Sequence, residues 1–149
     1  KDMRMAEYRK LICEVFPDVT TIRDGDFRTH YTFILGDYNL SYADCFALNE
    51  AAGDPHRFMW SGQRKRTTIS RAKAETPGTD AYANDYDHFT SSDREDDYIQ
   101  DSQVIDGPRR YYAQTGVPDF KAYVEKVSDH IPILFHFDLT RTRSPFVQI

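Results

Sequence analysis

The stretch TFILGDYNLSY, residues 32–42, decides the fold. Its apolar start is typical of a β-strand, which we predict over Tyr31–Leu35 and expect to be buried. The strand stops at Gly36, and two polar residues, Asp37 and Asn39, follow two positions apart. Aspartate and asparagine favour turns, so a polar turn is the simplest interpretation. A functional site built at the end of the strand is the alternative.

Composition narrows the choice of function. The chain has 149 residues, which suits one domain with a core, and its net charge is −5. That charge argues against a strongly basic nucleic-acid binder held by bulk electrostatics. No apolar run is long enough to cross a bilayer. Cys13 is expected to be a buried free thiol, although a disulfide with Cys45 stays open, and two cysteines do not define the compartment.

Helices are predicted in two places near the N-terminus. Apolar residues recur at helical spacing from Met5 to Phe16, and Pro17 is expected to end this helix. A second, shorter helix is predicted within residues 41–53, with Gly53 as its stop.

Strands and loops alternate through the rest of the chain. Strands are predicted over residues 66–70, 86–91, 98–106 and 131–139, turns over residues 60–62 and 93–97, and a loop over residues 72–85. Pro118 is placed where a further helix could begin. The alternation of helices and strands predicts a mixed α and β class, α/β or α+β.

Polar residues occur at the ends of three predicted strands. They are Asp37 with Asn39, Asp87, and Asp129 with His130. Strands of one sheet bring their ends together, so a cluster of carboxylates, an amide and an imidazole is expected. Oxygen ligands of this kind suit Mg²⁺ or Mn²⁺, and an imidazole held by a carboxylate can move a proton. The set favours metal-assisted phosphate chemistry.

Competing interpretations apply to several of these residues. Asp87 could be a surface residue at a strand edge, and Asp85 is its rival because it shares the same strand parity. By that parity His88 points to the opposite face from Asp87. His136 is better explained as a core or interface histidine than as a ligand.

A basic segment lies between two of the predicted strands. Its arginines Arg64, Arg66 and Arg71 could contact a substrate phosphate, and we single out Arg64 and Arg66 for this role. A solvated charged loop is the alternative, which charge runs usually form.

Two short motifs resemble a known family. The sequence GDYN (residues 36–39) resembles the GDFN signature, and SDHIPI (residues 128–133) resembles the SDHxP signature, of the endonuclease/exonuclease/phosphatase superfamily, the deoxyribonuclease I-like proteins. The motifs occur in the family's order, with the strand that carries Asp87 between them. The resemblance implies that Asp37 orients the attacking water and takes part in metal binding, and that Asn39 contacts the phosphate.

The resemblance also implies roles for the other site residues. Asp129 takes part in metal binding, His130 hydrogen-bonds the scissile phosphate and serves as acid or base, and Asp87 pairs with His130. The family domain is a four-layer α/β/β/α sandwich of two similar halves. Residues 1–149 match only the C-terminal half, and the chain begins with Lys1 rather than Met. We therefore expect an N-terminal half, or a second chain, to cover an exposed sheet face, and the chain by itself to be inactive.

The resulting functional expectation is a divalent-metal-dependent phosphoesterase that cleaves a P–O bond with activated water. A nuclease is the first choice, which makes nucleic acid the expected substrate. A phosphatase or phosphodiesterase acting on a small molecule or a lipid head group is the alternative within the class. A non-catalytic interaction domain that retains the fold is the alternative outside it.

Overall fold

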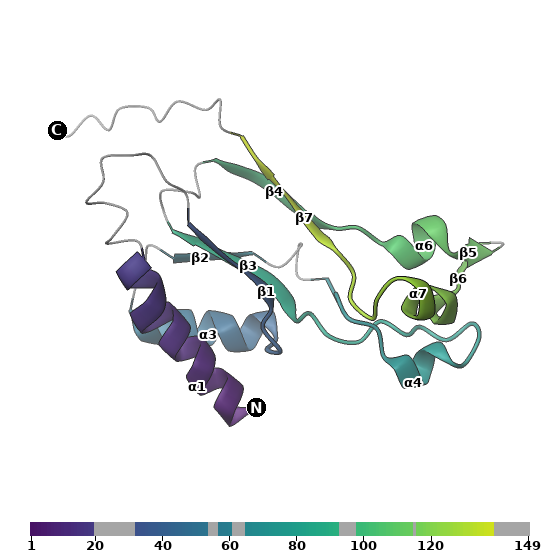
Figure 1. Ribbon diagram of the computed structural model, residues 1–149, viewed down its shortest axis with the longest axis horizontal. Helices are drawn as coiled ribbons and strands as arrows, with labels where there is room; N and C mark the ends of the chain where they lie inside the picture. The colour runs from purple at the N-terminus through teal and green to yellow at the C-terminus, as the bar shows by residue number, and fades with distance from the viewer. Residues whose placement is uncertain (20–31, 54–56, 61–64, 93–97, 115, 139–149) are drawn as a thin grey trace.

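The computed structural model describes residues 1–19, 32–53, 57–60, 65–92, 98–114 and 116–138 (Figure 1). The protein combines helices with small antiparallel sheets, so the predicted mixed α+β class is confirmed. The helices are α1 (Asp2–Lys10), α3 (Tyr42–Ala52), α4 (Arg71–Ala74), α6 (Gly107–Tyr111) and α7 (Phe120–Lys126). The strands are β1 (Phe33–Asp37), β2 (Arg57–Trp60), β3 (Asp87–Ser92), β4 (Ile99–Val104), β5 (Ala113–Gln114), β6 (Val117–Pro118) and β7 (Ile133–Phe137).

The first sheet has the strand order β1-β3-β2, and both pairings are antiparallel. Helices α1 and α3 lie along one side of it (Figure 1). A core of Tyr8, Ile12, Leu40 and Cys45 packs there. In the β1–β3 register Asp37 lies opposite Asp87, and Gly36 lies opposite His88. The register therefore places the two carboxylates side by side at one end of the sheet.

Strand β1 differs from its prediction in position and in burial. It runs over Phe33–Asp37, and Tyr31 lies outside the described residues. The strand was expected to be buried, but Leu35 is 59% exposed and Asp37 is exposed as well. The hydrophobic run was a poor guide to burial: Phe33 and Ile34 are half-buried, and the strand is exposed from Leu35 to Asp37.

The first helix does not end at Pro17. Helix α1 passes into a π-helical turn, η1 (Leu11–Val15), and the helical backbone continues to Val19. The wider turn leaves room for the proline ring, which in a regular α-helix clashes with the carbonyl four residues earlier. Ile12 and Phe16 face the core, whereas Cys13 is exposed and Cys45 is buried. The prediction of a buried Cys13 is wrong, and no disulfide forms because both thiols are free.

Helix α3 agrees with its predicted start and stop. The Ser41 hydroxyl accepts a hydrogen bond from the Asp44 backbone N–H, which caps the first turn. Gly53 ends the helix with a left-handed φ of 69°, a conformation that costs glycine little. This helix fixes the segment that directly follows Asp37 and Asn39.

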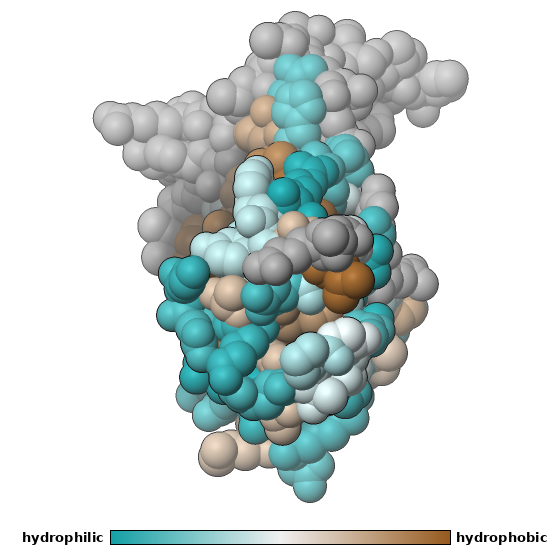
Figure 2. All heavy atoms as spheres, turned by 90° about the vertical axis from the view of Figure 1, so that its right-hand side faces the viewer, coloured by the Kyte–Doolittle hydropathy of each residue, from teal (hydrophilic) through white to brown (hydrophobic). Residues whose placement is uncertain are grey.

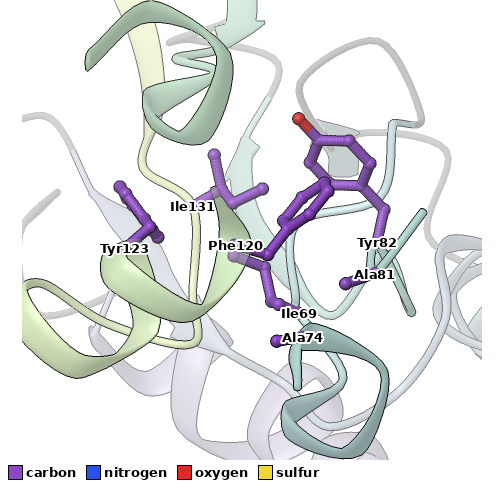
Figure 3. Packing of buried hydrophobic residues seen from close by; sticks show 7 residues of the cluster. All are labelled: Ile69, Ala74, Ala81, Tyr82, Phe120, Tyr123 and Ile131. Carbon is purple, nitrogen blue, oxygen red and sulfur yellow. The ribbon is translucent and has the colours of Figure 1, made fainter. Parts of the chain in front are cut away.

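A second core lies beneath α7 and supports the segment around His130. It contains Ile69, Ala74, Ala81, Tyr82, Phe120, Tyr123 and Ile131, from four separate parts of the chain (Figure 3). The predicted strand over residues 66–70 is reduced to two isolated bridges, Thr68 with His130 and Ile69 with Tyr82. The first of these bridges holds His130 against the segment that precedes α4. The predicted loop over residues 72–85 begins inside the short helix α4.

The C-terminal strands form a separate two-stranded sheet, β4 with β7. Aromatic side chains pack this sheet against the first one. The Phe135 ring centroid lies 4.6 Å from that of Phe89 and 5.5 Å from that of Phe33. On β7 the outward side includes Leu134, which is 50% exposed. The predicted strands over residues 86–91, 98–106 and 131–139 correspond to β3, β4 and β7, with Leu139 outside the described residues.

Pro118 was placed at the start of a helix, and this is wrong. It lies in β6, and helix α7 begins two residues later with Asp119 as its N-cap. The Asp119 carboxylate accepts from the Ala122 N–H at 2.9 Å, so an acidic side chain sets the helix start.

The molecule's α4–α6–α7 end has a mostly hydrophilic surface with scattered hydrophobic side chains (Figure 2). Within the described residues no helix is long and apolar enough to span a membrane. Residues 61–62 of the predicted turn over 60–62, and the acidic turn at 93–97, lie outside the described residues. Trp60 belongs to β2.

Candidate active site

The GDYN segment builds a turn that is closed by its own side chains. The two Asp37 carboxylate oxygens accept from the Asn39 backbone N–H at 2.8 Å and from the Asn39 side-chain Nδ2 at 2.9 Å. Asn39 has a positive φ of 52°, a left-handed conformation that asparagine tolerates better than most residues. The Asp–x–Asn spacing is thus the one that this turn requires.

Gly36 is required by backbone conformation and not by crowding. Its φ of 146° is one that side chains rarely adopt, yet a Cβ placed on it would meet no atom within 4 Å. The open space around Gly36 forms part of the cleft described below.

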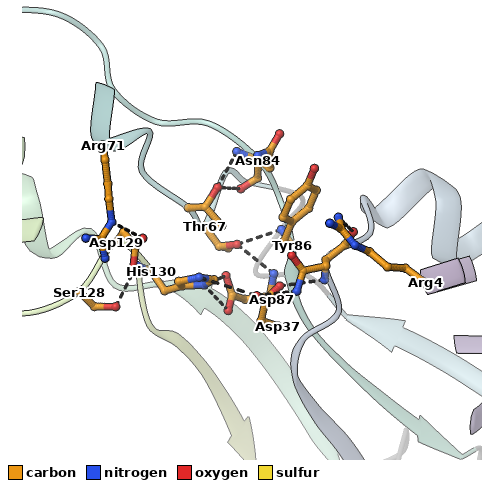
Figure 4. Close-up of polar contacts among 12 residues, drawn as sticks. Arg4, Asp37, Thr67, Arg71, Asn84, Tyr86, Asp87, Ser128, Asp129 and His130 are labelled. Carbon is orange, nitrogen blue, oxygen red and sulfur yellow. Dashed lines mark hydrogen bonds and ion pairs between the residues drawn. The ribbon is translucent and has the colours of Figure 1, made fainter. Parts of the chain in front are cut away.

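Asp87 and His130 are brought into contact from distant parts of the sequence. The His130 Nδ1 lies 3.0 Å from both Oδ1 and Oδ2 of Asp87 (Figure 4). A carboxylate can only accept, so Nδ1 carries a proton and Nε2 is directed to the other side of the ring. The contact that the resemblance implied is present, and the catalytic role of each residue stays a prediction.

Thr67 holds the backbone on which Asp87 sits. Its buried hydroxyl accepts from the N–H groups of Tyr86 at 3.1 Å and Asp87 at 3.0 Å, and its carbonyl accepts from the Ile131 N–H at 2.7 Å. One residue therefore connects the strand that carries Asp87 to the segment that carries His130. On the other flank, the Ser128 hydroxyl accepts from the His130 N–H at 3.0 Å.

The free side of the His130 ring faces Asp37. Its Nε2 lies 3.8 Å from the Asp37 Oδ2, so an oxygen atom placed beside the two could contact both. Partial burial, the largest influence, lowers the pKa of His130. The hydrogen bond to Asp87 and the negative charges of Asp87, Asp37 and Asp129 outweigh it, so the pKa lies above its ordinary value. The geometry therefore favours a histidine that is protonated more often than a free one.

Asp129 points away from this group and pairs with Arg71. The Arg71 Nε donates to the Asp129 Oδ2 at 2.8 Å, and this bond holds the pKa of Asp129 below its usual range. The described residues contain no group of three His, Cys, Asp or Glu side chains arranged to hold a metal ion. Since Asp87 is occupied by His130 and Asp129 by Arg71, the described donor set does not by itself fit Mg²⁺ or Mn²⁺.

The rival residues have other partners. The Asp85 carboxylate accepts from the Tyr42 N–H at 3.0 Å, at the start of α3, so Asp87 and not Asp85 belongs to the site. His88 faces the opposite side from Asp87 as predicted, and its Nε2 lies 2.9 Å from the buried Leu40 carbonyl. His136 is exposed on β7, so it is not a core residue of this chain.

Of the two arginines singled out from the sequence, Arg66 makes its contacts away from the site. The Arg66 guanidinium pairs with Asp80 at 2.8 Å and donates to the Tyr82 carbonyl at 3.0 Å. Arg64 lies outside the described residues. Arg71, from the same basic segment, is the one that borders His130 through Asp129.

A cleft of about 360 Å³ opens beside the site. Asp87 and His130 line it together with apolar residues of β1, β3 and β7, among them Leu35, Phe89 and Phe135. A mostly apolar cleft with a few convergent polar groups is the usual form of a ligand site.

Sequence reasoning missed two residues that the structure adds to the site, Thr67 and Arg4, and it named a third, Arg71, without singling it out. Thr67 carries no motif signal, because its role depends on which backbone groups fold against it. Arg4, on α1, donates from Nη1 to the Asn39 carbonyl at 3.3 Å, across 35 positions of sequence. Arg71 was visible only as one member of a basic segment.

Known proteins offer no guide to this site. No protein-family model, curated protein or solved structure matches the chain. A function must therefore be argued from the site geometry.

Proposed function

We propose that this chain supplies catalytic residues of a phosphoester hydrolase that cleaves a P–O bond with water, with a nuclease as the first choice. The observation that carries the proposal is the alignment of Asp87, His130 and Asp37. The carboxylate of Asp87 fixes one ring nitrogen of His130, and the other ring nitrogen faces Asp37 at 3.8 Å. A positioned acid–base histidine beside a second carboxylate is the arrangement that such chemistry needs.

Each residue has a role that its contacts support. Asp37 retains free lone pairs after its two bonds to Asn39, so it can orient a water molecule and accept its proton. The water oxygen forms the new bond to phosphorus as the bond to the leaving oxygen breaks. Protonated His130 donates from Nε2 to a phosphate oxygen and offsets the developing negative charge. The leaving oxygen takes a proton from solvent, and Asp37 returns its own proton to solvent.

Asn39 is proposed to contact the phosphate with the side-chain N–H that does not bond Asp37. An amide nitrogen has two donors, and the structure commits one of them at 2.9 Å. The left-handed turn fixes this amide next to Asp37, so donor and carboxylate would reach the same phosphate group.

The metal requirement is part of the proposal, although the described residues do not form a metal centre. Asp37 and Asp129 are the carboxylates proposed to contribute to Mg²⁺ or Mn²⁺ binding, with further ligands from outside the described residues. Asp129 would contribute through Oδ1, because its Oδ2 accepts the bond from Arg71. The resemblance places those further ligands in an N-terminal half, so we propose that residues 1–149 are the C-terminal half of a four-layer sandwich. The exposed Leu35 and Leu134 support a covering partner.

The test is hydrolysis by the full-length protein that carries this chain. Plasmid DNA, p-nitrophenyl phosphate and a phospholipid diester are assayed with Mg²⁺, with Mn²⁺ and with EDTA. We expect DNA cleavage that EDTA stops, that Mg²⁺ restores, and that His130→Ala reduces on the order of 10²- to 10⁴-fold. Cleavage of the monoester or the lipid alone would replace the nuclease by a phosphatase or a lipid phosphodiesterase. Turnover that is absent, or equal in wild type and His130→Ala, would overturn the proposal and favour an interaction domain.

A further inference from the structure

Arg71 presents an available guanidinium at one side of the site. Only its Nε is engaged, in the 2.8 Å bond to Asp129, and within the described residues its two Nη atoms have no hydrogen-bond partner. The side chain is 72% exposed, against 36% for Asp129. The bond to Asp129 therefore orients the guanidinium and leaves its outer edge, the two-donor fork that suits a phosphate, in solvent.

Arg4 presents a second guanidinium at the other side. It comes from α1, which is fixed against the turn by the Tyr8 and Tyr38 rings, 5.2 Å apart between centroids. Its Nη1 donates to the Asn39 carbonyl at 3.3 Å, and the side chain is otherwise exposed. This arginine is anchored by a backbone oxygen, and within the described residues it forms no ion pair with a carboxylate.

The two arginines flank the proposed reaction centre. In Figure 4, Arg71 lies beyond Asp129 on one side of the His130–Asp87 pair, and Arg4 lies beyond Asp37 on the other. Three carboxylates, Asp37, Asp87 and Asp129, would repel an approaching phosphate. Among the described residues, Arg4 and Arg71 are the arginines that hydrogen-bond to members of this site.

The placement on two sides distinguishes between substrates. A lone phosphomonoester that occupies the space between His130 and Asp37 cannot reach outward in both directions. A chain of phosphodiesters places one phosphate on each side of the scissile one, where each can meet a guanidinium. The positions of the two guanidinium groups therefore favour a nucleic-acid strand on grounds separate from the family resemblance.

We propose that Arg4 and Arg71 bind the phosphates on either side of the scissile phosphate, and that the substrate is a nucleic-acid strand. The inference rests on the proposed function, because it takes the space between His130 and Asp37 as the position of the scissile phosphate. It assigns binding roles to two residues outside both sequence motifs.

The experiment measures binding separately from hydrolysis. A fluorescent single-stranded phosphorothioate oligonucleotide, which resists cleavage, is titrated with the full-length protein over a range of salt concentrations. The variants are Arg4→Gln, Arg71→Gln and the double variant. Arg109→Gln is the matched control. Arg109 is an exposed arginine on α6, and it pairs with Asp106, the N-cap of that helix. Circular dichroism checks that each variant is folded.

We expect each site variant to weaken oligonucleotide binding about tenfold or more, as loss of a charge-assisted contact does. The slope of log K against log salt should fall by about 0.7 for each arginine removed. Arg109→Gln should leave both quantities unchanged. Arg71→Lys should recover the salt slope but only part of the affinity, because lysine keeps the charge and loses the fork.

Several results would overturn the inference. The inference fails if Arg4→Gln and Arg71→Gln bind the oligonucleotide with wild-type affinity and salt slope. It also fails if Arg109→Gln weakens binding as much as they do. Tight binding of an inositol polyphosphate through both arginines, without oligonucleotide binding, would reject the nucleic-acid strand. His130→Ala separates the two proposals: it should lose cleavage of unmodified DNA by a far larger factor than it loses oligonucleotide affinity, and the effect of each arginine variant on affinity should persist in its background. Cleavage that depends on His130 but ignores both arginines would sink this inference and leave the proposed function standing.

Discussion

His130 and Asp87 lie 43 residues apart in sequence, and the Nδ1 of the histidine is 3.0 Å from each carboxylate oxygen of the aspartate. The aspartate is the less exposed partner, with 19% of its side chain accessible against 37% for the histidine. Because Thr67 holds the Asp87 backbone and Ser128 holds that of His130, both partners are oriented before any substrate arrives.

Asp87→Asn should shift the pH dependence of hydrolysis. The Asp87 carboxylate helps to raise the pKa of His130, so its removal lowers that pKa. If protonated His130 is the active form, the rate falls as pH rises through the pKa of His130. The falling limb of the pH–rate profile should therefore move to lower pH in Asp87→Asn. Asp101→Asn, on the exposed side of β4, is the control. A limb that stays at the wild-type pH would show that another group sets it.

Asp37→Asn should remove most of the activity while the protein stays folded. Asparagine can still accept the Asn39 backbone N–H with its single oxygen, so one of the two bonds that close the turn is kept and the bond from the Asn39 side chain is lost. Its amide cannot take a proton from water. We expect a loss in kcat on the order of 10²- to 10⁴-fold. Steady-state kinetics gives the rate, and a thermal melt gives the stability. Glu50→Gln, at the end of α3, serves as the charge control, and a variant at Asp37 with wild-type kcat would exclude this residue from the chemistry.

Thr67→Val should destabilise the protein although the two side chains have similar shapes. Valine leaves the N–H groups of Tyr86 and Asp87 without their buried acceptor, which costs about 1–3 kcal/mol in the free energy of unfolding. Thr67→Ser keeps the hydroxyl and should recover part of that loss. Urea denaturation compares the three proteins, and equal midpoints for valine and threonine would show that water replaces the hydroxyl.

His88 should make the folded protein sensitive to acid. Burial lowers the pKa of His88 below its ordinary value, despite the Leu40 carbonyl and the charges of Asp85, Asp87 and Asp37. Its Nδ1 has no hydrogen-bond partner in the described structure. As pH falls below about 6.5, His88 becomes protonated in the unfolded chain but stays neutral in the folded chain. Its contribution to stability is therefore retained above that pH and lost below it.

The measurement is urea unfolding at about pH 7.5 and at about pH 5.5. His88→Gln can still donate to Leu40 but does not titrate, so it should lose less stability between the two pH values than wild type. His136→Gln, on the exposed side of β7, should behave like wild type. His130 contributes with the opposite sign: its raised pKa adds stability at low pH, which is lost as pH rises through that pKa. An identical acid loss in His88→Gln would assign the effect elsewhere.

Sequence patterns predicted an element correctly where its ends are set by residues adjacent in sequence. Ser41 and Gly53 bounded α3 correctly, because a serine cap and a left-handed glycine act within one turn. The helix end predicted at Pro17 and the helix start predicted at Pro118 were both wrong, because other nearby residues set the local structure there. A π-helical turn accommodates the first, and Asp119 starts the helix that the second was expected to begin. Burial of β1 could not be read from its apolar residues, since it depends on which face other elements cover.

Some residues of the candidate site could likewise be predicted from local sequence, and others could not. Asp37, Asn39, Asp129 and His130 occur in short motifs, so sequence alone could nominate them. The choice between Asp85 and Asp87 needed the strand register, which sets Asp87 opposite Asp37 and gives Asp85 to the start of α3. Thr67, Arg4 and Arg71 act across 20, 35 and 58 positions of sequence, and no local pattern encodes such contacts.

The two thiols of the chain differ in reactivity, and the π-helical turn near Pro17 carries the exposed one. It leaves Cys13 in solvent, whereas burial, with the nearby charges of Asp44 and Asp85, raises the pKa of Cys45 to about 12. The thiolate is the form that attacks a maleimide, so at neutral pH this reagent would modify the exposed Cys13 and spare the buried Cys45. The wild-type protein can therefore be dye-labelled or tethered to a surface through its first helix, with no engineered cysteine.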